Sequence, residues 1–89
     1  MLNTVNAKGV MPASHPLAVG GSPSLGAVRT AMAAADVVLA VGTEWGETDY
    51  DMLFLGPIDL PGKLIRVDID ARQLARNRRP ALALVSDAA

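Results

Sequence analysis

The chain has 89 residues, of which 51% are hydrophobic and 19% are charged, and its formal net charge is −1. This length allows one small domain, and the composition is typical of a folded chain rather than a disordered one. Without cysteine the chain forms no disulfide and has no thiolate chemistry. The nearly neutral charge argues against nucleic acid or an anionic membrane as a partner. No apolar run approaches the roughly 20 residues of a spanning helix, so we expect a cytoplasmic protein.

The first third of the chain predicts a strand end, a loop and a helix. Residues 2–5 are expected to end a strand, and a loop rich in glycine and proline follows them. Ser22 or Ser24 can cap the helix that comes next, and Pro23 suits its first turn. The apolar residues of this helix recur at helical spacing, at Leu25, Val28, Met32 and Ala35.

The remainder of the chain predicts three strands. Residues 36–42, "DVVLAVG", form a continuous apolar run that is typical of a strand covered on both faces. Residues 43–62 are acidic, with glycine and proline, and predict a loop with a short helical turn near Tyr50. Residues 63–70, "KLIRVDID", predict a second strand, and a short helix over 71–77 leads to a third at 81–88.

This order of elements predicts an α/β fold, a partial Rossmann-like parallel sheet with crossover helices. A parallel sheet needs helices on both of its faces, and the chain offers one good helix and one short one. We therefore expect that part of the domain, a first strand and helix, is missing before residue 1.

Two aspartates follow the second predicted strand, and each has two interpretations. Ligands of open parallel sheets bind outside the carboxyl ends of the strands, where an acid can accept hydrogen bonds from ribose hydroxyls. Asp68 and Asp70 are placed to do this, together with Gly42 after the first strand and Asp87 after the third. The alternative is structural: Asp70 caps the following helix, and Asp68 bonds loop amides. The missing G-x-G-x-x-G phosphate loop weakens the ligand interpretation.

Three ordered segments carry a family resemblance: "NAKGVMPASHPLAVG", "ADVVLAVGTE" and "LIRVDIDARQLARNRRPALALVSDA". Together they resemble the central domain of thiamine-diphosphate-dependent enzymes of the acetolactate synthase and 2-oxo acid decarboxylase group. The resemblance implies that residues 1–89 are a partial central domain, in which residues 2–5 are the second strand. It also implies flanking pyrimidine- and diphosphate-binding domains, a homo-oligomeric parent enzyme, and thiamine diphosphate with magnesium bound outside this chain.

The resemblance also implies a set of cofactor-binding positions. In relatives that bind FAD or ADP in this domain, the matching positions contact the nucleotide; here they are Gly42, Thr43, Asp68, Asp70 and Asp87. Two departures argue against FAD. Glu44 stands where the FAD-binding synthases usually have an arginine, and "GSPSLG" replaces their "GMHG" stretch. The loop "GTEWGETDYD" is more similar to that of decarboxylases acting on guanidino 2-oxo acids.

Two functions of different classes follow. The first is a non-catalytic central-domain fragment of a thiamine-diphosphate-dependent 2-oxo acid decarboxylase or acetolactate synthase-like enzyme, a scaffold with a nucleotide crevice. The second is a stand-alone module that binds ADP or a similar nucleotide. We predict no catalytic residue and no metal ligand in this chain, because the family's activating glutamate and its "GDG…N" motif are absent from the sequence.

Overall fold

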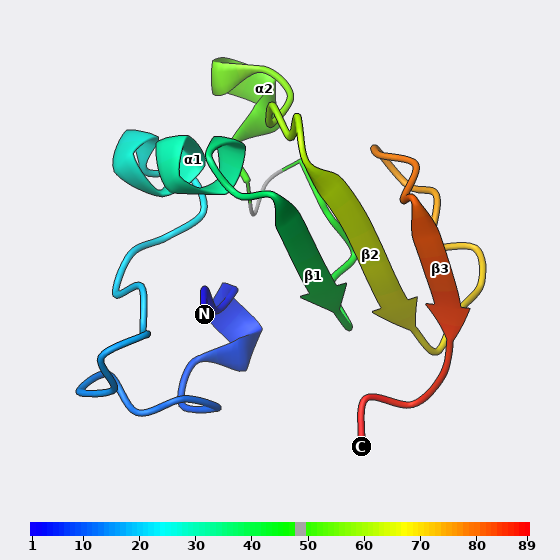
Figure 1. Cartoon of the computed structure of the whole chain (residues 1–89), viewed down its shortest axis with the longest axis horizontal. Helices are drawn as coiled ribbons and strands as arrows, with labels where there is room; N and C mark the ends of the chain where they lie inside the picture. Colours follow the sequence, from blue (N-terminus) through cyan, green and yellow to red (C-terminus); the bar gives the residue numbers. More distant parts are fainter. Residues whose placement is uncertain (48–49) are drawn as a thin grey trace.

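A computed structural model of the chain describes residues 1–47 and 50–89. Its elements in chain order are η1 (Val5–Ala7), α1 (Gly26–Ala33), β1 (Val37–Val41), α2 (Met52–Leu55), β2 (Lys63–Asp68) and β3 (Leu82–Val85). The three strands form one sheet in the order β1-β2-β3, and both pairings are parallel (Figure 1). The expected partial Rossmann-like sheet is therefore confirmed.

The two faces of the sheet differ because the register places different residues on them. Ala40 of β1 pairs with Arg66 of β2, and Val38 pairs with Leu64, so these four side chains share one face. Ala40 and Leu64 are buried on this face, in a core with Trp45, Tyr50, Ile58 and Leu60, and Met32, Val38 and Met52 pack against it.

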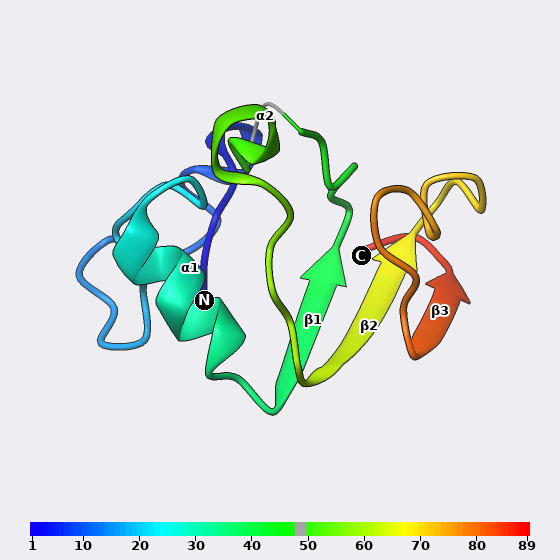
Figure 2. The same ribbon diagram turned by 90° about the horizontal axis from the view of Figure 1, so that it is seen from above.

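The opposite face of the sheet, the open face, is apolar and uncovered. It consists of Val37, Leu39, Val41, Ile65, Val67, Leu82 and Leu84, which the register aligns across all three strands. Leu39 is 62% exposed and Leu82 49%, although a strand of a parallel sheet is normally buried on both sides. Figure 2 shows α1 and the N-terminal segment beside the β1 edge, and no helix beyond β3. The prediction that residues 36–42 are covered on both faces is therefore wrong for this chain.

Helix α1 is fastened to the β1–β2 connection by one arginine. The Arg29 guanidinium donates hydrogen bonds to the carbonyl oxygens of Tyr50 at 2.8 Å, Gly56 at 2.7 Å and Pro57 at 3.0 Å. The acceptors at residues 56 and 57 follow α2 directly, where carbonyls lack partners within the helix. Arg29 thus holds the connection that crosses the buried face of the sheet.

Three local predictions are wrong. Helix α1 begins at Gly26 after Leu25, with no side-chain cap, because the Ser22 and Ser24 hydroxyls hydrogen-bond to each other at 2.9 Å before the helix starts. Residues 2–5 are not a strand of the sheet: Leu2 forms a single bridge with Val19, and η1 begins at Val5. Residues 71–77 form turns and bends instead of a short helix.

The predicted loop over residues 43–62 is confirmed where the structure describes it, and its helical turn is α2. Residues 48 and 49 of this loop lie outside the described residues. No helix in the described part of the chain is long and apolar enough to span a bilayer.

Candidate functional site

A pocket of about 410 Å³ lies at the carboxyl ends of the strands, which point to one edge of the sheet (Figure 2). Gly42 lines it from the end of β1, Asp68 and Asp70 from the end of β2, and Asp87 from the segment after β3. The structure thus brings together four of the five predicted site residues. Glu44, Gln73 and Ser86 complete its polar lining. We call this cavity the strand-end pocket.

The backbone at this edge explains why the four residues meet. The Gly42 amide donates to the Val67 carbonyl at 2.9 Å, and the Ser86 amide donates to the Asp68 carbonyl at 3.1 Å. Each bond extends the parallel pairing by one step beyond the last regular pair of residues. Gly42 has φ of +60°, a left-handed conformation that glycine adopts without steric cost, and it turns the chain away from the sheet.

Asp68 and Asp70 both accept local hydrogen bonds. Asp68 Oδ1 accepts the Asp70 amide at 2.9 Å, and Asp70 Oδ1 accepts the Arg72 amide at 2.9 Å. The Arg72 guanidinium also approaches the Asp70 carboxylate, with Nη2 to Oδ2 at 2.8 Å and Nε to Oδ1 at 3.0 Å. The structural interpretation is thus realised in part, since Asp70 caps a turn and not a helix. Both residues still line the pocket.

The Asp70–Arg72 ion pair affects the pKa of Asp70 and hence how the stability of the fold depends on pH. Hydrogen bonds from the Arg72 side chain, then the Arg72 amide, hold the pKa of Asp70 below its usual 3.8. A lowered folded-state pKa stabilises the fold above the unfolded-state pKa, and this contribution is lost as pH falls through the folded-state value. Because Arg72 is 90% exposed, we expect no measurable change in stability.

Arg72→Ala should therefore raise the pKa of Asp70 toward 3.8 without changing the melting temperature. An NMR titration of the Asp70 carboxyl carbon measures this shift. Arg79→Ala, which changes another exposed arginine, is the control and should leave the Asp70 titration unmoved. An unchanged Asp70 pKa in the Arg72 variant would show that the ion pair is absent in solution.

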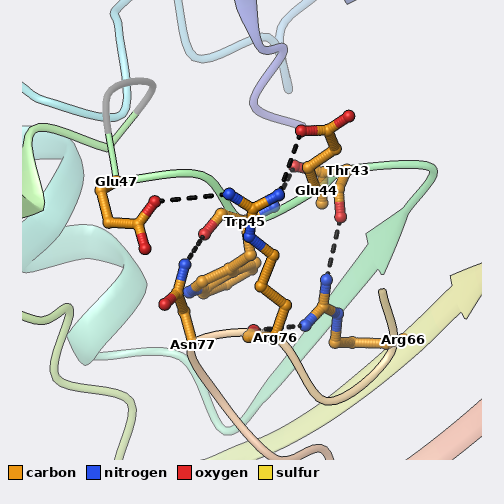
Figure 3. Close-up of polar contacts among 7 residues, drawn as sticks. All are labelled: Thr43, Glu44, Trp45, Glu47, Arg66, Arg76 and Asn77. Atoms are coloured by element: carbon orange, nitrogen blue, oxygen red, sulfur yellow. Dashed lines mark hydrogen bonds and ion pairs between the residues drawn. The ribbon is translucent and has the colours of Figure 1, made fainter. Parts of the chain in front are cut away.

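Thr43, the fifth predicted residue, does not line the pocket and belongs to a neighbouring group of contacts that we call the Arg66 cluster: Thr43, Trp45, Arg66, Arg76 and Asn77 (Figure 3). Arg66 is 1% exposed, and its guanidinium donates to the Thr43 carbonyl at 3.0 Å and the Arg76 carbonyl at 2.8 Å. It also lies 5.7 Å from the centre of the Trp45 ring, within cation–π range. Burial lowers the pKa of Arg66, and Asp68 and Tyr50 oppose this effect.

Further contacts tie the same two loops together (Figure 3). The Asn77 amide donates to the Trp45 carbonyl at 2.7 Å, and Asn77 and Trp45 both have positive φ, 59° and 55°. Arg76 forms ion pairs with Glu44 at 3.4 Å and Glu47 at 3.5 Å. The pKa of Glu47 is lowered by a hydrogen bond from the Glu47 backbone amide, by one from the Asn77 side chain, and by the charge of Arg76. The loops after β1 and β2, which form two walls of the pocket, are thus locked to each other.

Sequence reasoning did not single out Arg66 or Asn77. An arginine at the centre of "LIRVD" was available as a signal, because a charged residue within a buried strand needs polar partners. Those partners could not be found from local pattern, because they lie 23 and 10 residues away in the chain.

The family model for the central domain of thiamine pyrophosphate enzymes matches residues 1–89. The chain therefore belongs to this family, and the resemblance of its three sequence segments is confirmed. The fold and the position of the pocket are consistent with this family, since the sheet is parallel and the pocket lies at the carboxyl ends of its strands.

Two curated proteins are similar to the chain. A probable 2-ketoarginine decarboxylase, AruI of Pseudomonas aeruginosa, is 40% identical over 88 residues, which are 99% of this chain and 15% of that protein. A probable acetolactate synthase large subunit of Methanocaldococcus jannaschii is 32% identical over 88 residues, 96% of this chain and 14% of that protein. The chain thus spans about one seventh of the length of these relatives. No solved structure matches it.

The residues of this chain do not fit thiamine diphosphate and its metal. Among residues 1–47 and 50–89, no three acidic or histidine side chains gather closely enough to hold a metal ion. A diphosphate also needs hydrogen-bond donors or cations, and the described lining of the strand-end pocket contains no lysine, arginine or histidine. We therefore derive no chemical step through this cofactor.

Proposed function

We propose that residues 1–89 are part of the central domain of a thiamine-diphosphate-dependent 2-oxo acid decarboxylase or acetolactate synthase-like enzyme, in which they are a non-catalytic scaffold. Flanking pyrimidine- and diphosphate-binding domains of the parent enzyme would hold thiamine diphosphate and magnesium, and the parent would be a cytoplasmic homo-oligomer. Family membership and the length of the relatives support this proposal.

The observation that carries the proposal is the open face of the sheet. Five of its seven apolar side chains are at least 45% exposed, at Val37, Leu39, Val41, Leu82 and Leu84. A contiguous apolar surface of this kind is costly in water and marks a surface for packing. Strand β3, which is exposed throughout, also offers an unpaired edge. A domain with these two features is suited to work within a larger polypeptide.

The substrate proposal is narrower and rests on the 40% identical relative, which is described as a probable 2-ketoarginine decarboxylase. The loop "GTEWGETDYD" after β1 also resembles that of decarboxylases acting on guanidino 2-oxo acids. We propose a guanidino 2-oxo acid as the parent's substrate. Decarboxylation of 2-ketoarginine, compared with pyruvate, by the purified full-length enzyme tests this; a preference for pyruvate would contradict it.

Leu39→Glu tests the scaffold proposal. A carboxylate at the centre of the open face would be buried without a partner wherever other chain segments cover that face, so we expect the full-length enzyme to lose most of its activity and assembly. Size-exclusion chromatography and decarboxylase assays measure both.

Val10→Glu is the matched control, since Val10 is 69% exposed and belongs to none of the three strands. Wild-type activity and assembly are expected for this variant. If Leu39→Glu behaved like the control, the open face would be in water in the parent enzyme, and the scaffold proposal would be wrong.

A stand-alone ADP-binding module is the second candidate. The position of the strand-end pocket favours it, because four of the predicted nucleotide-contacting residues line that pocket. The negative charge of the pocket lining argues against this candidate, because the phosphates of a nucleotide are also negative. Binding of FAD or ADP therefore stays a prediction of the family resemblance.

A further inference from the structure

We draw no further inference here: the strongest candidate, the exposed apolar surface patch that Leu53, Phe54 and Leu55 form on α2, is an unpartnered face, and nothing in the structure shows what covers it.

Discussion

Replacing Arg66 with methionine is expected to lower the free energy of opening of the β1–β2 region by about 1–3 kcal/mol. Methionine fills much of the same space, but the Thr43 carbonyl loses the donor that bonds it at 3.0 Å. The Arg76 carbonyl loses its 2.8 Å bond from Arg66 and keeps the Arg78 amide as a donor at 2.7 Å. Leaving a part-buried acceptor without a partner costs about 1–3 kcal/mol. Native-state hydrogen exchange of the full-length protein, followed at the amides of β1 and β2, measures the change.

Two further variants define what Arg66 contributes. Arg66→Lys keeps the charge but lacks the planar fork that reaches two carbonyls, so an intermediate loss is expected. Arg79→Met removes an exposed arginine and should change little. Faster exchange in the Arg66 variants should extend to residues 43–47 and 72–79, because the Arg66 cluster joins these loops. Protection equal to that of the Arg79 control would mean that the cluster does not hold the loops.

Gly62→Ala is the second change with a large expected effect. A Cβ atom at this position would lie 2.3 Å from the Ala35 carbonyl oxygen and 2.5 Å from that of Asp36. Both are backbone atoms, and the Asp36 carbonyl accepts the Lys63 amide at 2.9 Å, where the pairing of β1 and β2 starts. Relieving the clash must therefore disturb this pairing, at a cost of about 2–3 kcal/mol.

Gly26→Ala is the matched control for this variant. Gly26 is the first residue of α1, and a Cβ atom there meets nothing within 4 Å. Alanine is the better helix former, so the control should be neutral or slightly stabilising. Thermal melts of the two full-length variants make the comparison. Equal melting temperatures would contradict the close backbone approach at Gly62.

The strands and their carboxyl-end edge were predictable from the sequence because both follow from local pattern. Runs such as "VVLAV" and "LIRVD" have strand length and strand composition, and parallel connectivity then places Gly42, Asp68, Asp70 and Asp87 at one edge. These residues meet around one pocket, as the pattern implied. Their role as cofactor-binding residues stays a prediction.

The predicted helix over residues 71–77 failed because contacts outside the segment override its local pattern. Arg66 takes the Arg76 carbonyl, and Asn77 adopts a left-handed conformation with its side chain on the Trp45 carbonyl. A regular helix over residues 71–77 would not place the Arg76 carbonyl against Arg66 or give Asn77 a left-handed conformation. Thr43 likewise faces the Arg66 cluster instead of the pocket, a placement set by a strand 20 residues further along the chain.

The most direct test of the central claim, that these residues are a scaffold within a larger enzyme and not an independent module, is a thermal melt of residues 1–89 by far-ultraviolet circular dichroism, with and without millimolar ADP. The open face predicts an aggregated sample or one without a cooperative transition, and no effect of ADP. A cooperative transition that rises with ADP would contradict the claim, since a ligand that binds only the folded state raises its stability. The chain would then be a nucleotide-binding module in its own right.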